Sequence, residues 1–227
     1  MTDPALRLPE EILLLALDDA KGTIEFGSLW QHAAGGAIVA ELLLGGRLRT
    51  SDHKRPRLEV VDATPLGDPV LDDALREIGA ARKPKAGADW VSKLGGRRDL
   101  KERLTAGLVV RGVLAEREGK VLGVFPRTQY PARDGRPETE VVARLERAIF
   151  TETRELAPRT VVLVALANAA GLLPNVFAKR RLKDRKERLQ RITTSDAAGA
   201  MTREAIEAMQ AALAVAAIIP VFFVTTT

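Results

Sequence analysis

The spacing of apolar residues along the chain predicts a protein built mainly from helices. In Leu8–Asp19 and Ala37–Leu44, apolar side chains occur almost all round a helix, a pattern typical of buried helices. The doublet Gly45–Gly46 ends the second segment, because glycine readily leaves helical geometry. These two segments therefore predict two helices that are buried on all sides.

Amphipathic helices are predicted along the rest of the chain, where apolar residues recur at helical spacing. Three of them are expected to start at aspartate caps, at Asp68, Asp89 and Asp99. A basic, proline-containing linker, Ala80–Gly87, separates the first two. Further helices are expected at Thr139–Thr151, Thr160–Ala170, Lys179–Arg191 and Thr202–Ile219.

Short strands are predicted in two places. Arg57–Asp62 alternates apolar and polar residues and can pair with Arg47–Thr50. Val113–Glu116 and Lys120–Phe125 can form a hairpin around Glu118–Gly119. The expected fold class is mainly α, with a single-domain helical bundle core, surrounding amphipathic helices and small β-hairpins.

Size and composition agree with one domain in a reducing compartment. The chain has 227 residues, 46% of them hydrophobic, and we expect a domain over residues 8–224 after an N-terminal tail, residues 1–7. Without cysteine it can form no disulfide or thiolate site. The start lacks the pattern of a secretory signal, and the longest apolar run, Ala211–Val224, has 14 residues where a bilayer span needs roughly 20. We expect a cytoplasmic protein in which this run is a buried helix ending near Pro220.

Positive charge is concentrated in one segment. The formal net charge is +5, and Lys179–Arg191 holds eight basic residues against Asp184 and Glu187, a surplus of six. Such a segment can attach to anionic lipid at about 1 kcal/mol for each basic residue near the surface. It can equally be a solvated amphipathic helix packed through its apolar positions. The candidate residues of this basic segment are Lys179, Arg180, Arg181, Lys183, Arg185 and Lys186.

The sequence offers no apparatus for catalysis. His32 and His53 are the only histidines, neither at metal-binding spacing, and phosphate-loop, dinucleotide and nucleophile-elbow motifs are absent. The adjacent carboxylates Asp18–Asp19 and Asp72–Asp73 point away from each other on helices, and solvated helix faces explain them. We therefore expect a binding or adaptor protein with no cofactor and no metal, and not an enzyme.

Five segments, in order and near the appropriate spacing, resemble the Golgi phosphoprotein 3 family. They are Leu8–Gly22, Ala37–Leu48, Pro65–Leu75, Glu102–Leu114 and Leu166–Phe177. The resemblance implies a cytoplasmic, peripherally membrane-associated protein, at the Golgi face if the source is eukaryotic, that binds phosphatidylinositol 4-phosphate. It also implies a trafficking adaptor that gathers client proteins, and self-association through the segment that follows Phe177.

The resemblance also implies a headgroup pocket formed by an early tryptophan and several arginines, two of them just before a long apolar helix. The matching residues here are Trp30, Arg154 and Arg159, while Gly35 stands where the family has another arginine. Guanidinium groups suit phosphate, and indole suits the headgroup layer. Trp30 is expected in a loop and partly exposed, with core packing as the alternative; Trp90 is expected to pack.

Two other functions fit parts of the sequence. The helix Asp99–Arg111 followed by the hairpin Val113–Phe125 resembles a nucleic-acid-binding winged helix. Glu102 offsets the cations of that helix, and its polar side has no Asn or Gln to read adenine, which disfavours nucleic acid as a partner. The other alternative is a structural oligomer without a ligand.

Overall fold

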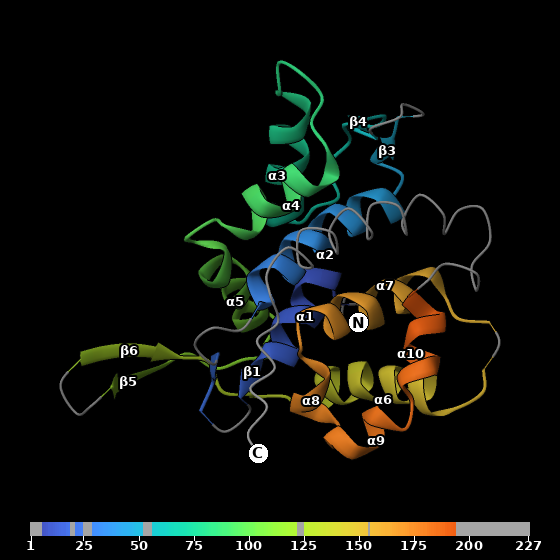
Figure 1. Cartoon of the computed structure of the whole chain (residues 1–227). Coiled ribbons are helices and arrows are strands. Elements are labelled where there is room, and N and C mark those ends of the chain that lie inside the picture. Colours follow the sequence, from blue (N-terminus) through green and yellow to red (C-terminus); the bar gives the residue numbers. More distant parts are fainter. Residues whose placement is uncertain are drawn as a thin grey trace.

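The structure is a computed structural model that describes residues 6–18, 21–24, 29–51, 56–121, 125–153 and 155–193. Within these ranges the chain forms ten helices and three two-stranded antiparallel sheets, as Figure 1 shows. The mainly helical fold class is confirmed. The predicted helix Thr202–Ile219 and the apolar run Ala211–Val224 lie outside the described residues.

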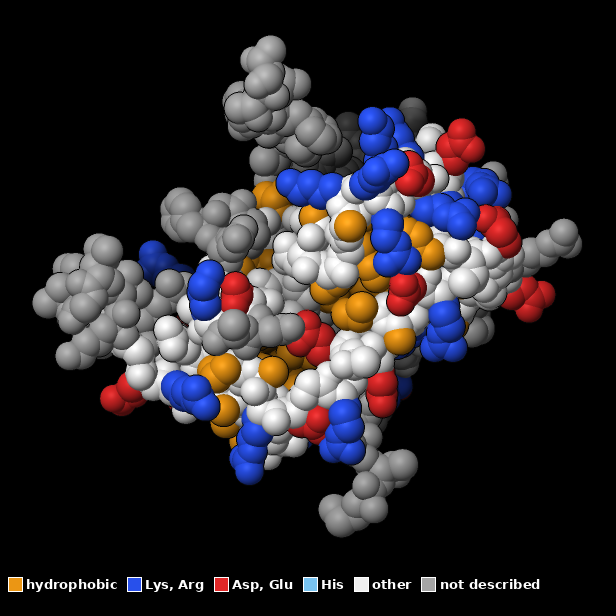
Figure 2. All heavy atoms as spheres, turned by 90° about the horizontal axis from the view of Figure 1, so that it is seen from below, with side chains coloured by type: hydrophobic (Ala, Val, Ile, Leu, Met, Phe, Trp, Pro, Cys, Tyr) orange, Lys and Arg blue, Asp and Glu red, His pale blue; other side chains and the backbone are white. Residues whose placement is uncertain are grey.

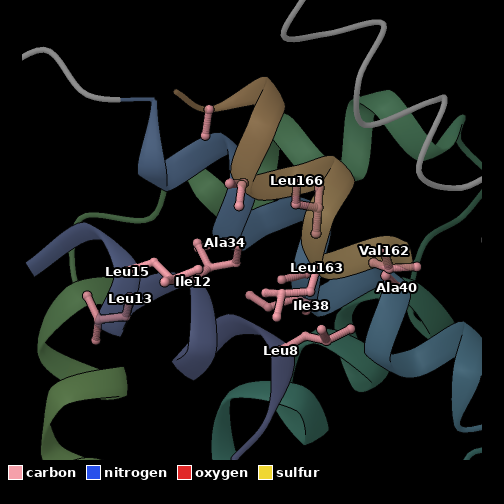
Figure 3. Packing of buried hydrophobic residues seen from close by; sticks show 14 of the residues in the cluster. Leu8, Ile12, Leu13, Leu15, Ala34, Ile38, Ala40, Val162, Leu163 and Leu166 are labelled. Carbon is pink, nitrogen blue, oxygen red and sulfur yellow. The ribbon is translucent and has the colours of Figure 1, made fainter. Parts of the chain in front are cut away.

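Three helices that are buried almost all round form the centre of the core: α1 (Leu8–Ala16), α2 (Trp30–Leu44) and α7 (Pro158–Ala169). All nine residues of α1 are buried. Figure 3 shows Ile38 of α2 beside Leu163 of α7, and both side chains are fully buried. Since an apolar face must be covered, helices apolar on every side lie where other elements surround them.

Helix α2 contacts α4 (Gly87–Gly95) at backbone distance, through one glycine on each helix. A Cβ atom at Gly35 would lie 2.4 Å from the carbonyl oxygen of Val91, and one at Gly95 would lie 2.3 Å from that of Gln31. Position 35, where the resemblance implies an arginine, therefore has no room for a side chain.

Helices α3 (Pro69–Gly79) and α5 (Leu100–Val110) complete this side of the core. The predicted cap is confirmed for α3, because the Asp68 carboxylate accepts hydrogen bonds from the backbone N–H groups of Val70 and Leu71. The predicted cap Asp89 was wrong, since α4 begins at Gly87 and Asp89 lies in its first turn. Asp99 occupies the N-cap position of α5, but its side chain makes no capping hydrogen bond.

The sheets are small. β1 (Leu17–Asp18) pairs with β2 (Thr23–Ile24), so the first helix ends before the predicted Asp19. β3 (Leu48–Thr50) pairs with β4 (Leu58–Val60), as predicted. β5 (Arg117–Val121) pairs with β6 (Phe125–Gln129). The predicted turn at Glu118–Gly119 was wrong, because these residues lie within β5 and the strands connect after Val121.

The remaining helices follow β6. α6 (Arg136–Phe150) begins earlier than predicted, with Pro137 in its first turn. After α7 come α8 (Leu173–Val176), α9 (Lys179–Lys183) and α10 (Lys186–Thr193). The predicted single helix Lys179–Arg191 was wrong, because the chain turns at Asp184 and Arg185. Figure 1 places α3 and α4 at one end of the molecule and α8 and α9 at the other.

Candidate functional site

A cluster of buried ion pairs surrounds the start of α1. Its carboxylates, Glu10 and Glu11 of α1 and Glu41 of α2, are 4%, 2% and 6% exposed. Four arginines contact them: Arg7, Arg111, Arg144 and Arg159. A buried charge is tolerated only where it is paired and hydrogen-bonded, so this cluster requires its arginines to keep their places.

Arg159 makes the most contacts of the four. Its Nη1 donates to Oε1 and Oε2 of Glu41 at 2.7 and 2.8 Å, and its Nη2 donates to the carbonyl oxygen of Leu6 at 2.6 Å. Nη2 also lies 3.5 Å from Glu11 Oε1. Burial lowers the pKa of Arg159, but the charges of Glu41 and Glu11 outweigh burial and raise the pKa above its usual value. The guanidinium is therefore charged and bound to buried carboxylates, while 29% of the Arg159 side chain is exposed.

The other arginines complete the cluster from different elements. Arg111, at the end of α5, is ion-paired with Glu10. Arg144 of α6 places Nη2 2.7 Å from Glu11 Oε2, and Arg7 places Nη1 3.8 Å from Glu41 Oε1. Glu41 Oε2 also accepts the backbone N–H of Leu8 at 2.7 Å. The cluster thus joins α1, α2, α5, α6 and α7, which lie far apart in the sequence.

The structure places Trp30 and Arg159, two of the sequence-predicted headgroup residues, apart from each other. Trp30 is only 6% exposed and begins α2, so the expectation of a partly exposed loop residue was wrong. The partner of Arg159, Glu41, lies 11 residues further along the same helix, or about 16 Å at 1.5 Å per residue. Arg154 lies outside the described residues. Trp90 is 1% exposed, which confirms that it packs.

The basic segment combines anchored and exposed cations. Arg181 pairs with Glu146 at 2.9 Å, Arg185 with Glu152 at 2.8 Å, and Arg188 donates to the Ala148 carbonyl oxygen at 3.2 Å. Leu189 and Ile192 are buried against the core. The cations that are exposed and form no ion pair within the described part of the chain are Lys179, Arg180, Lys183, Lys186 and Arg191.

This division explains how a surplus of charge is held at the surface. The apolar residues and the three arginines fix α9 and α10 on α6 and α7, while the remaining cations meet solvent. The second interpretation of this segment, an amphipathic segment that packs through its apolar positions, is thus confirmed for those positions. Figure 2 looks at the molecule from the α8 and α9 end and shows Lys and Arg side chains distributed around that face, with carboxylates between them.

The cations of the predicted winged helix have internal partners. Arg103 pairs with Asp73, Arg111 with Glu10, and Lys101 lies over the ring of Tyr130 at 5.3 Å. Among the described residues, no group of three or more potential metal ligands occurs. In the same ranges, none of the helices has the length and apolar character that crossing a bilayer requires.

Comparison with known proteins places the chain among similar sequences. The family model described as Golgi phosphoprotein 3 (GPP34) matches residues 8–209, a span that includes all five segments noted above. The vacuolar protein sorting-associated protein 74 of Eremothecium gossypii is 29% identical over 209 residues, which cover 78% of this chain and 62% of the relative. The chain therefore spans less than two thirds of that relative's length.

Proposed function

The chain belongs to the Golgi phosphoprotein 3 family, and on that premise we propose that it is a peripheral membrane protein that binds an anionic phospholipid headgroup. Family resemblance makes phosphatidylinositol 4-phosphate the first lipid to test. The observation that carries the proposal is the set of exposed cations on α9 and α10 that have no ion-pair partner among the described residues. The role proposed is binding, without catalysis.

The electrostatics of this surface suit a membrane better than a single small ligand. Each basic residue near an anionic leaflet contributes about 1 kcal/mol. A useful affinity therefore results when this surface lies flat on the membrane and brings all five cations close to it: Lys179, Arg180, Lys183, Lys186 and Arg191. Such attraction acts over the Debye length, about 10 Å at 0.1 M salt. Binding is therefore expected to weaken as the salt concentration rises.

Within this proposal Arg159 supports the fold around the start of α1 and is not one of the cations that bind the headgroup. Its guanidinium already binds Glu41 and Glu11, both nearly inaccessible to water. Trp30 is assigned a packing role on the same ground of burial. Arg154 remains a predicted headgroup ligand.

A role as trafficking adaptor at the Golgi completes the proposal. The name of the fungal relative refers to vacuolar protein sorting, and the family implies client proteins and self-association. Both functions require the membrane attachment argued above, so that attachment is the step to test first.

The test is co-sedimentation of the full chain with three kinds of vesicle: phosphatidylcholine alone, with phosphatidylserine, and with phosphatidylinositol 4-phosphate. Binding is expected only to the anionic vesicles, and Lys179→Ala/Arg180→Ala should weaken it by about ten-fold or more, at about 1 kcal/mol for each residue. The matched control is Arg98→Ala/Arg117→Ala, which removes two exposed cations elsewhere. Equal binding to neutral and anionic vesicles, or equal losses in both variants, would overturn the proposal.

A further inference from the structure

A second basic surface lies at the opposite end of the molecule, where the chain connects α3 to α4. It surrounds a hollow of about 630 Å³. Two carboxylates, Glu77 and Asp89, also line the hollow, and Trp90 contributes to its wall. The cations that line it are Arg57, Arg82, Lys83, Lys85 and Lys93.

The connecting segment is held in place by its backbone. The N–H of Leu58 in β4 donates to the carbonyl oxygen of Lys85 at 3.0 Å, and the Arg57 guanidinium donates to the carbonyl oxygen of Pro84. These bonds attach the segment to the β3–β4 sheet on one side of the hollow. Lys83 and Lys85 thus extend from an anchored backbone.

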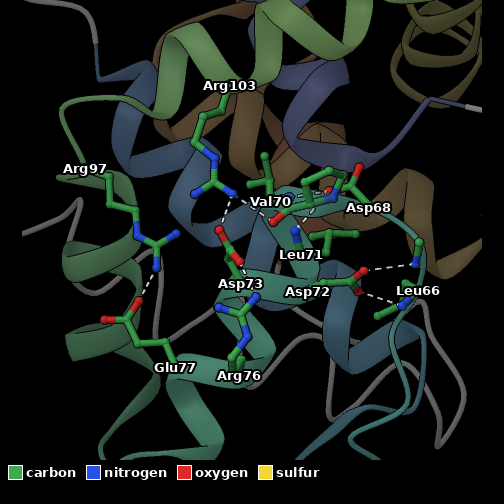
Figure 4. Close-up of polar contacts among 12 residues, drawn as sticks. Leu66, Asp68, Val70, Leu71, Asp72, Asp73, Arg76, Glu77, Arg97 and Arg103 are labelled. Atoms are coloured by element: carbon green, nitrogen blue, oxygen red, sulfur yellow. Dashed lines mark hydrogen bonds and ion pairs between the residues drawn. The ribbon is translucent and has the colours of Figure 1, made fainter.

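Ion pairs tie together the helices around the hollow, and Figure 4 shows those of Glu77 with Arg97 and of Asp73 with Arg103. Glu77 of α3 pairs with Arg97, just after α4, and with Lys93 of α4. One helical turn earlier in α3, Asp73 pairs with Arg103 of α5. Glu77 carries one negative charge and is shared between two cations. Part of the positive charge around the hollow therefore has no carboxylate to balance it.

Trp90 provides an apolar surface beneath two of the lysines. The Nζ atoms of Lys85 and Lys93 lie 5.5 and 5.2 Å from the centre of its ring, within the range of a cation–π contact. Arg82 and Lys83 are exposed and form no ion pair among the residues described by the structure. The lysines are therefore gathered over one ring although they repel one another.

We propose that this hollow binds an anion that carries at least two phosphate groups. Five lining cations and two carboxylates leave a formal surplus of three positive charges, and each phosphate monoester carries about −1.5 to −2 at pH 7. Two phosphates thus match the surplus. The inference does not rest on the proposed function, because the hollow lies at the other end of the molecule from α8 and α9 (Figure 1).

The test is isothermal titration calorimetry of the full chain with inositol 1,4,5-trisphosphate. Lys83→Ala/Lys85→Ala should weaken binding by about ten-fold or more, since charge-assisted contacts to phosphate are lost. The matched control is Lys179→Ala/Arg180→Ala, which removes the same charge from the basic segment and should leave this affinity unchanged. Trp90 emission should change on binding in the unmodified chain and not in the Lys83/Lys85 variant.

The outcomes separate this site from the membrane surface. Absence of binding by the full chain, or equal losses in the two double variants, overturns the proposal. Vesicles that contain phosphatidylinositol 4,5-bisphosphate distinguish the source of the phosphates: weaker vesicle binding by Lys83→Ala/Lys85→Ala identifies a lipid headgroup, and unchanged vesicle binding identifies a free phosphate ligand. A membrane defect confined to the Lys179/Arg180 variant leaves this site unaffected.

Discussion

Arg159→Ala tests the assignment of this arginine to the buried ion-pair cluster. The substitution removes both hydrogen bonds to Glu41 and the contact with Glu11, whose side chains are 7% and 3% exposed. Removing one partner of a buried ion pair typically costs about 3–5 kcal/mol. Glu41 keeps the hydrogen bond from Leu8 N–H, and Glu11 keeps Arg144, so we expect a loss near the lower limit, about 3 kcal/mol.

Equilibrium unfolding in urea measures this loss as a lower midpoint at an unchanged slope. For a domain of this size, about 3 kcal/mol corresponds to a fall in Tm of roughly 6–12 °C. Arg117→Ala is the control, because Arg117 is exposed on β5 and surface substitutions usually change stability by less than about 0.5 kcal/mol. A Glu41→Gln/Arg159→Met double variant should lose less than the sum of its single variants, since the two residues are in contact.

The same variant decides between the two roles of Arg159. If Arg159→Ala is as stable as Arg117→Ala and yet loses binding to anionic vesicles, the arginine contacts the headgroup and the reasoning from burial is refuted. If stability falls and the folded fraction still binds vesicles, Arg159 is a structural residue.

Three further predictions concern packing and pH. Trp30→Ala should lower the free energy of unfolding by about 3–5 kcal/mol, and Trp30 emission should be blue before any vesicle is added; a stable variant that loses only membrane binding would contradict its burial. Gly35→Ala should lower Tm clearly, because its Cβ would lie 2.4 Å from a backbone oxygen; an unchanged Tm would mean that α2 and α4 do not touch there. Hydrogen bonds from Arg76 and Arg103 lower the pKa of Asp73 in the folded protein. The ionised Asp73 therefore stabilises the fold fully above its unfolded pKa of about 3.9, and this stabilisation is lost as the pH falls through its lower pKa in the folded state. Asp73→Asn should therefore flatten the loss of stability on acidification, measured by urea midpoints between about pH 2 and 7, and an unchanged slope would refute the pairing.

The residues that sequence reasoning placed correctly depend on local patterns. The all-round apolar segments of α1 and α2 could only be buried, and Asp68 followed by Pro69 is a capping pattern complete within a few residues. The pairing of β3 with β4 follows from alternation over a short connection. Such features are decided by neighbours in the chain, so the sequence alone identifies them.

The split of the basic segment shows where local patterns are insufficient. Helical spacing of Leu182, Leu189 and Ile192 predicted one helix, but Arg185 turns to bind Glu152 and the carbonyl oxygen of Phe150. The turn is stabilised by residues more than thirty positions earlier. A pattern read within one segment contains no information about such partners.

The candidate site depended most on tertiary structure. From the sequence, Arg159 was an arginine at the start of an apolar helix, suited to phosphate, and Glu41 was one polar residue in a buried helix. Their contact joins positions 118 residues apart, and it pairs this cation with a buried carboxylate. The sequence by itself determined the family, most of the helices and the amount of positive charge. Only the fold decided which cations are neutralised inside the protein and which remain at the surface to meet an anion, because pairing depends on distance in space.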